Sequence, residues 1–108
     1  MKEGPTSVLI CRSRLNRKGR LEHDETVVRG PAVSDLVAAL NSLAPGEEGA
    51  FACETAPPLR YLIGLRYSDA GETHVEAEYS GCPAVRTKDG YWDASTELRE
   101  KLDALLGH

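Results

Sequence analysis

A four-residue turn pattern occurs three times in this chain and constrains its fold more than any other feature. Each copy has a polar residue in the first position and glycine in the fourth: Asn16-Arg17-Lys18-Gly19, Ser68-Asp69-Ala70-Gly71 and Thr87-Lys88-Asp89-Gly90. The pattern is typical of a type I turn followed by a glycine with positive φ, which together close a three-residue hairpin loop. The sequence therefore predicts three β-hairpins.

The first hairpin has a predicted register that suits both faces of its strands. A loop of residues 17–19 sets apolar residues opposite one another and two arginines opposite two acids. Opposite charges across two strands stabilise a sheet by about 0.2–1 kcal/mol per pair. The predicted pairs are Leu15 with Leu21, Leu9 with Val27, Val8 with Val28, Arg14 with Glu22, and Arg12 with Asp24.

The other two hairpins follow from the same turn chemistry. In the second, a shift by one residue would set apolar side chains opposite polar ones, so a loop of residues 69–71 is favoured. Its predicted pairs are Ser68 with Glu72, Arg66 with His74, Leu65 with Val75, Ile63 with Ala77, and Tyr61 with Tyr79. The third hairpin is shorter, and its predicted pairs are Val85 with Asp93, and Arg86 with Trp92 as a cation–π contact.

Two stretches have the apolar spacing of amphipathic helices. The first begins at Gly30-Pro31, because proline is tolerated in the first helical turn, and it ends at Pro45-Gly46. The second begins with Ser95 or Thr96 as its N-cap. The apolar stripes are Val33, Leu36, Val37, Leu40 and Leu43 in the first helix, and Leu98, Leu102, Leu105 and Leu106 in the second.

These elements predict the order β-β-α-β-β-β-β-α, with one further short strand at Ala50–Cys53. A length of 108 residues is typical of a single domain, so residues 1–108 are expected to form one α+β domain. An antiparallel sheet of three hairpins, with both helices packed on it, is the architecture that buries both apolar stripes.

Composition limits the kinds of partner and the cellular compartment that are expected for this chain. A net charge of −4 argues against a nucleic-acid partner. No apolar stretch approaches the roughly 20 residues that span a bilayer, so no membrane partner is expected. We expect a cytoplasmic protein if this is the full-length chain, and an extracellular one if an export signal has been removed.

The ionisable residues are predicted to lie on strand surfaces rather than in a catalytic site. In His23-Asp24-Glu25, neighbours on a strand point to opposite faces; a site of His23, Glu25 and Cys11 on one face is conceivable, but it lacks ligand-type spacing. No nucleophile, phosphate-binding or dinucleotide-binding motif is present. We therefore predict no enzyme, no metal and no cofactor. The solvent-facing side of the second hairpin is expected to hold Arg60, Arg66, His74, Glu76 and Glu78.

Three cations at the tip of the first hairpin have no predicted acidic partner: Arg17, Lys18 and Arg20. A solvated hairpin tip is the simplest interpretation. The alternative is a cytoplasmic regulatory domain that binds an anionic ligand or nucleic acid through this tip.

The chain has three cysteines, Cys11, Cys53 and Cys82, with no CxxC spacing. The predicted register of the second hairpin sets Cys82 opposite Pro58, five residues from Cys53. A disulfide between Cys53 and Cys82 would brace the loop between them, and two reduced thiols are the alternative. A further alternative is a thiol-based enzyme or redox sensor that uses Cys82, which lies between Gly81 and Pro83.

The layout over residues 7–82 resembles that of the Streptomyces subtilisin inhibitor family. A hairpin, Ser7–Arg29, is followed by the helix Val33–Leu43, Cys53, a short loop, the hairpin Leu59–Ser80, and Cys82. The stretch from Ser34 to Leu43 also resembles the family's helix. The chain lacks the family's other disulfide, and it ends in a predicted helix where the family ends in a strand.

The resemblance implies a non-enzymatic protein-binding module with a serine protease as partner. It places a protease-binding loop directly after Cys53, formed by Glu54, Thr55, Ala56 and Pro57, with Thr55 nearest the scissile position. It also implies a homodimer formed through the sheet.

Overall fold

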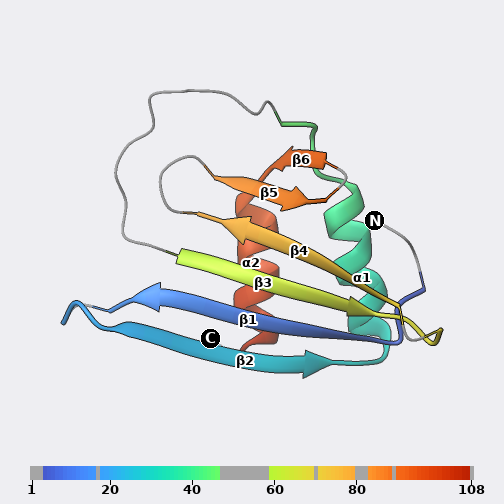
Figure 1. The fold of residues 1–108 in the computed structure, drawn as a ribbon, viewed down its shortest axis with the longest axis horizontal. Coiled ribbons are helices and arrows are strands. Elements are labelled where there is room, and N and C mark those ends of the chain that lie inside the picture. The colour runs from blue at the N-terminus through green and yellow to red at the C-terminus, as the bar shows by residue number, and fades with distance from the viewer. Residues whose placement is uncertain are drawn as a thin grey trace.

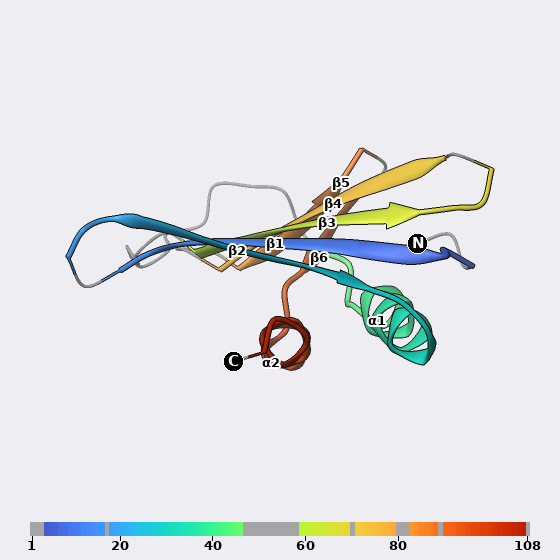
Figure 2. The same ribbon diagram turned by 90° about the horizontal axis from the view of Figure 1, so that it is seen from below.

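Six strands form one antiparallel sheet, and two helices lie against one of its faces (Figures 1 and 2). The computed structural model describes residues 4–16, 18–46, 59–69, 71–79, 83–88 and 90–107. The elements are β1 (Ser7–Leu15), β2 (Leu21–Val28), α1 (Pro31–Asn41), β3 (Leu59–Arg66), β4 (Glu72–Glu78), β5 (Ala84–Thr87), β6 (Gly90–Asp93) and α2 (Thr96–Leu105). Their order confirms the predicted α+β class. The predicted strand at Ala50–Cys53 lies outside the described residues.

The spatial order of the strands is β2-β1-β3-β4-β5-β6. After α1, the chain returns to pair β3 with β1, not with β2, so β2 becomes the outermost strand on that side of the sheet. The helices cover one face of this sheet, and Figure 2 shows the other face without a helix. We call the helix-free side the open face.

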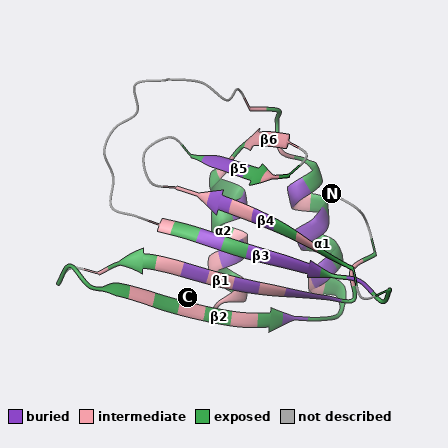
Figure 3. Cartoon of the chain, viewed as in Figure 1, coloured by how far each residue is buried: buried purple, intermediate pink, exposed green. Residues whose placement is uncertain are grey.

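The core lies between the sheet and the helices (Figure 3). Every second residue of the central strands points into it, as the two-residue repeat of a strand requires. Both helices contribute the apolar stripes that the sequence predicts. The largest fully buried side chains are Tyr61, Ile10, Leu36, Leu40, Ile63, Leu65, Leu98, Leu102, Val8, Val75 and Val85.

Local signals set the helix ends. Pro31 occupies the first turn of α1, and Gly30 precedes it with a φ of 76°, a conformation that favours glycine. Ser95 is the N-cap of α2, because its Oγ accepts a hydrogen bond of 3.1 Å from the Leu98 backbone N–H. The predicted start of each helix is confirmed, and α1 ends at Asn41, ahead of Pro45-Gly46.

The register of the first hairpin is confirmed in all five predicted pairs. Gly19 has a φ of 75°, as the predicted turn requires. The register of the second hairpin was predicted two residues off: Ile63 pairs with Val75, and Leu65 with Thr73. The Tyr67 N–H donates to the Gly71 carbonyl over 2.9 Å, so Gly71 pairs with Tyr67 and, contrary to the prediction, does not belong to the turn itself. A shift of two residues keeps every side chain on its face, so apolar alternation does not distinguish the two registers.

The third hairpin is one residue away from its predicted register. Val85 pairs with Trp92, and Arg86 with Tyr91. The physical reason is burial: opposite Val85, the Trp92 side chain packs against the core, whereas opposite Arg86 it would lie on the open face. The predicted cation–π contact therefore forms with Tyr91, whose ring centre lies 5.6 Å from the Arg86 guanidinium carbon.

The facing of β1 and β2 can be tested by truncating one side chain from each side of the sheet. Ile10 is fully buried on the helix-covered side, so Ile10→Ala should lower the free energy of unfolding by about 2–5 kcal/mol. Leu21→Ala removes a side chain that is 56% exposed and should change it by about 0.5 kcal/mol or less. Urea unfolding of both variants measures the difference. Equal losses of unfolding free energy in the two variants would contradict the placement of Ile10 and Leu21 on opposite sides of the sheet.

Candidate functional site

The open face carries an exposed group of large apolar side chains at its β2 side. Its members are Leu15 (40% exposed), Leu21 (56%), Val27 (46%) and Leu62 (44%), which we call the apolar patch. Exposed apolar groups of this kind mark protein interaction sites more often than isolated surface leucines do.

The strand register brings Val27 and Leu62 into one surface, whereas Leu15 and Leu21 pair with each other beyond the row of Ser13 and His23. Val27 pairs with Leu9, and Leu9 pairs with Gly64. In the adjacent row of the same face, Glu25 pairs with Cys11, and Cys11 pairs with Leu62. Directly opposite side chains lie about 4.5–5.5 Å apart, so Leu9 and Cys11 lie between the exposed members on β2 and β3.

Beyond β3, the open face becomes charged. β4 presents three acids and a histidine there: Glu72, His74, Glu76 and Glu78. The arginines of β3 contact two of these acids at long distances, 3.8 Å from Arg60 to Glu76 and 4.0 Å from Arg66 to Glu72. Exposed ion pairs at such distances contribute little stability. The apolar patch therefore borders a strip in which three glutamates of β4 alternate with three arginines, Arg60 and Arg66 of β3 and Arg86 of β5.

The predicted solvent-facing side of the second hairpin is confirmed by this arrangement. Glu76 and Glu78 share the open face with Arg60, Arg66 and His74, as the sequence predicts. His74 Nε2 lies 3.2 Å from Glu72 Oε1. The Glu72 carboxylate also lies over Gly64, where an added Cβ would approach Oε1 to 2.6 Å.

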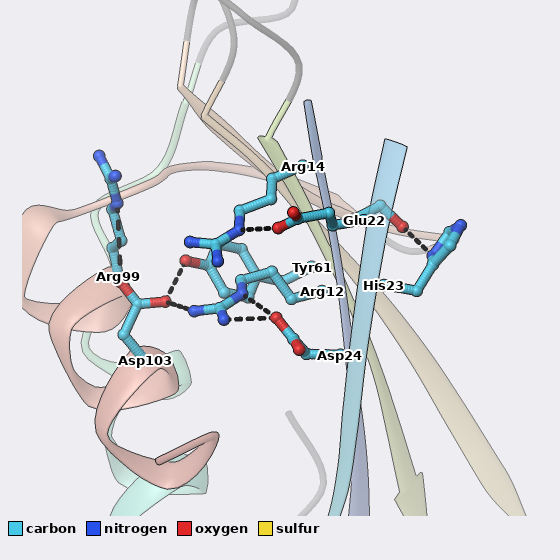
Figure 4. A network of polar contacts seen from close by, with 9 residues as sticks. Arg12, Arg14, Glu22, His23, Asp24, Tyr61, Arg99 and Asp103 are labelled. Carbon is cyan, nitrogen blue, oxygen red and sulfur yellow. Dashed lines mark hydrogen bonds and ion pairs between the residues drawn. The ribbon is translucent and has the colours of Figure 1, made fainter. Parts of the chain in front are cut away.

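A second polar cluster lies under the opposite face, between the sheet and α2 (Figure 4). Arg12 is only 2% exposed and is held by two carboxylates. Its Nη2 donates to Asp24 Oδ2 over 2.5 Å, and its Nη1 donates to Asp103 Oδ1 over 2.8 Å. The Tyr61 hydroxyl donates to the same Asp103 oxygen over 2.5 Å. The cluster thus ties the edge strand β2, through β1 and β3, to α2.

Burial and charge raise the pKa of both Tyr61 and Arg12. Burial, followed by the hydrogen bond to Asp103, raises the pKa of Tyr61 to about 12. Burial works to lower the pKa of Arg12, but its hydrogen bonds to Asp24 and Asp103 outweigh this effect and raise it. Arg12 therefore keeps its charge between the two carboxylates, and the cluster acts as a structural clamp between β2 and α2.

The structure adds to the predicted pairing of Arg12 its burial. The Arg12–Asp24 and Arg14–Glu22 pairs both form as predicted, but only Arg14 and Glu22 lie in solvent. The strand that carries Arg12 turns Val8 and Ile10 toward the helices, and Arg12 follows on the same side. Arg12 therefore lies in the interior, which the predicted pairing alone did not specify.

The residues around His23 form hydrogen bonds but no metal site. Ser13 Oγ and His23 Nδ1 lie 2.9 Å apart, and the Cys11 thiol lies 3.9 Å from Glu25 Oε2. Burial and the Glu25 charge raise the pKa of Cys11, which keeps its thiol protonated at neutral pH. Among the described residues, no group of three or more histidines, cysteines or acids is placed to hold a metal ion.

The tip of the first hairpin is partly described. Lys18 and Arg20 are exposed, and their backbone N–H groups both donate to Asn16 Oδ1 over 2.9 Å. Asn16 thus organises the turn, which the polar first position of the pattern predicts. Arg17, the third member of the predicted anion-binding tip, lies outside the described residues.

The predicted protease-binding loop also lies outside the described residues. This applies to Glu54, Thr55, Ala56 and Pro57, and to the predicted disulfide partners Cys53 and Cys82. The register that set Cys82 opposite Pro58 is corrected above, so that part of the argument for the disulfide no longer holds.

A cleft of about 470 Å³ separates α1 from α2. Its lining is mostly small or apolar, with three acids and one lysine: Asp35, Ala38, Ala39, Ser42, Leu43, Ala44, Asp93, Ser95, Glu97, Leu98 and Lys101. Among the described residues that line it, none is a histidine or a cysteine.

Comparisons with protein-family models, with curated proteins and with solved structures found no match. Within the described part of the chain, no helix is long and apolar enough to cross a membrane. The candidate site therefore depends on the geometry of this chain alone.

Sequence reasoning missed the apolar patch on the open face. The available signal was that β1 is apolar on both sides near its start, with Val8 and Ile10 on one face and Leu9 and Cys11 on the other. A strand that is covered on one side only must leave one of these pairs on the uncovered face.

The clamp at Arg12 predicts a difference between two neighbouring acids of β2. Asp24→Ala leaves a buried guanidinium with one acid fewer, and it should lower the free energy of unfolding by about 2–3 kcal/mol. Glu22→Ala removes the partner of the exposed Arg14 and should lower it much less, because water screens an exposed ion pair. Thermal and urea unfolding of both variants measure these changes. A larger loss for Glu22→Ala would rule out the clamp.

Proposed function

We propose that this protein is a non-enzymatic protein-binding module that binds its partner through the open face. The observation that carries the proposal is the apolar patch, in which Leu15, Leu21, Val27 and Leu62 are each at least 40% exposed on one side of a sheet. The described helices both lie on the other side of the sheet, where they bury their own apolar stripes (Figures 2 and 3).

The charges beside the patch specify the chemistry of the partner. β4 presents Glu72, Glu76 and Glu78 on the open face, with Arg60 and Arg66 of β3 on one side and Arg86 of β5 on the other. A partner protein that fits has an apolar centre, which covers Leu62 and Val27, and charged residues of both signs along the side that meets β4. Complementary charge of this kind sets orientation and the rate of association more than affinity.

The absence of a matching set of catalytic groups also favours binding over catalysis. The described ionisable residues either form structural pairs, as Arg12 does, or lie spread along exposed strands. Interfaces gain most of their affinity from a few central apolar or aromatic residues with a polar border, and the open face has this composition.

Protease inhibition by residues 54–57 is a second candidate. It is supported by the resemblance to the subtilisin inhibitor layout and by the observed order β1-β2-α1-β3-β4, which follows the order in that layout. In this proposal the binding residues are not those of the apolar patch, so substitutions can test the two functions independently.

The open-face proposal predicts contact at Leu62 but not on the helix side. A photocrosslinking amino acid at position 62 should give one defined protein adduct in cells that make the protein, and the same group at exposed Glu100 on α2 should not. Val27→Asp should reduce the adduct from position 62 at least several-fold, because it places a charge in the apolar patch. Equal adducts from positions 62 and 100, or no effect of Val27→Asp, would contradict the proposal.

The inhibitor proposal predicts that a subtilisin-like protease loses activity as stoichiometric protein is added. Thr55→Pro should abolish this inhibition, because proline removes a backbone donor and changes the backbone at the predicted scissile position. Leu62→Glu serves as the control, since it changes the open face and should inhibit as the unaltered protein does. Residual protease activity after titration is the measurement. Full activity with the unaltered protein would exclude this candidate and leave the open-face proposal standing.

A further inference from the structure

The two edges of the sheet differ in how the rest of the chain covers them. At β6, the Asp93 N–H donates to the Ala44 carbonyl over 2.9 Å, and the Gly46 N–H donates to the Tyr91 carbonyl over 3.0 Å. At the outer side of β2, no backbone group of the described residues forms such a bond. The uncovered edge of a long strand is a template for pairing with another strand.

The backbone groups on this free edge belong to alternate residues of β2. The Asn16 N–H donates to the Arg20 carbonyl over 2.8 Å, so the even-numbered residues of β2 face β1. In an antiparallel ladder the intervening residues direct their N–H and C=O groups to the other side. These residues are Leu21, His23, Glu25 and Val27, and their side chains all lie on the open face.

This edge is complementary to itself. If two copies of β2 pair antiparallel about a twofold axis at Asp24, Leu21 of each copy lies opposite Val27 of the other. His23 then lies opposite Glu25 of the other copy. Both pairs recur by symmetry, so the edge would gain two apolar contacts and two contacts between histidine and glutamate.

Neighbouring registers lack this match. Pairing about His23 would set Leu21 opposite Glu25 and the two His23 residues opposite each other. Pairing about Glu25 would set two carboxylates together and His23 opposite Val27. Registers shifted by an odd number of residues would set open-face side chains opposite helix-side ones, so the two sheets would not be continuous.

The acids on the other side of β2 do not oppose this pairing, because they are already held within their own chain. Asp24 lies on the axis and would meet its symmetry copy, but Arg12 Nε and Nη2 bind it at 3.2 and 2.5 Å. Glu22 accepts from Arg14 Nε over 3.3 Å and would lie opposite Thr26. Charged residues usually protect an edge strand from pairing, and here those of β2 are either compensated internally or complementary across the axis.

We infer that β2 pairs with β2 of a second copy of this chain, antiparallel about Asp24, so that two sheets join into one. The open faces of both copies lie on the same side of the joined sheet. Leu21 and Val27 of each copy then extend the apolar patch of the other. The dimer leaves that face uncovered, so this inference does not depend on the proposed partner of the open face.

Charge exchange at positions 23 and 25 tests this inference. His23→Glu sets two acids opposite two acids, and a second variant, His23→Lys with Glu25→Lys, sets lysines opposite lysines. Each alone should dimerise at least about tenfold more weakly than the unaltered protein. An equimolar mixture of the two should form a heterodimer, because every lysine then faces a glutamate. Sedimentation over a concentration series measures all three.

Backbone amide exchange supplies a second readout within one strand. On dimerisation, the amides of Leu21, His23, Glu25 and Val27 should exchange at least about tenfold more slowly, while those of Glu22 and Asp24, which already face β1, should change little. Leu62→Glu is the control, because it changes the open face and should leave dimerisation intact.

Three results would overturn the inference. They are an unaltered protein that stays monomeric throughout the series, charge variants that dimerise as it does, and a mixture that forms no heterodimer. Loss of the dimer in Leu62→Glu alone would assign self-association to the open face instead.

Discussion

The pairing of β3 with β1 is the contact on which the rest of this structure depends. β3 lies antiparallel to β1 with Tyr61 opposite Arg12, so the face of β1 that carries Val8, Ile10 and Arg12 joins the helix-covered side. The same pairing occupies one edge of β1 while β2 holds the other. β2 is thereby left as the outermost strand, and the open face receives Leu9, Cys11 and Leu15.

The Arg12 clamp is a direct consequence of that pairing. An arginine on the covered side of a strand must be paired, because an isolated buried charge is costly. Asp24 from β2 and Asp103 from α2 supply the two carboxylates, and Tyr61 shares an oxygen of Asp103. The end of the core near α2 is therefore closed by a charged network instead of apolar packing, and the position of α2 is coupled to the edge strand. Arg99 adds to this region, with its guanidinium carbon 5.9 Å from the centre of the Tyr79 ring.

The apolar patch and the free edge of β2 follow from the same geometry. A one-layer sheet with both helices on one side has a second face that must be polar, or covered by a partner, or exposed at a cost in solubility. Here the β4 half of that face is charged, whereas the β2 half carries the exposed apolar side chains together with His23 and Glu25. The proposed dimer uses the backbone edge of β2 and the side chains of its four open-face residues, and it leaves the surface around Leu62 for the proposed partner.

The sequence by itself determined the elements and much of their local pairing. The first hairpin has its predicted register because the turn that ends at Gly19, with its positive φ, sets the loop length. The first helix begins at Pro31 as predicted, and Ser95, one of the two predicted N-caps, caps the second. Turn chemistry and caps are local, so neighbouring residues are sufficient to specify them. Local reasoning failed for the register of the second hairpin. A shift by two residues keeps every side chain on the same side of the sheet, so the alternation of apolar residues does not distinguish the two registers.

Only the tertiary structure decided which side of β1 is buried, which strand forms the edge, and where Trp92 packs. β1 begins with apolar residues on both faces, so its sequence permits either side to turn inward, and the choice is made by β3 and the helices, which lie far away in the chain. The Arg12–Asp103 contact joins residues that are 91 positions apart, so no local sequence pattern predicts it. The sequence did not predict the apolar patch for the same reason. Whether a strand face is exposed depends on which other elements cover it, and the residues of the strand do not specify those elements.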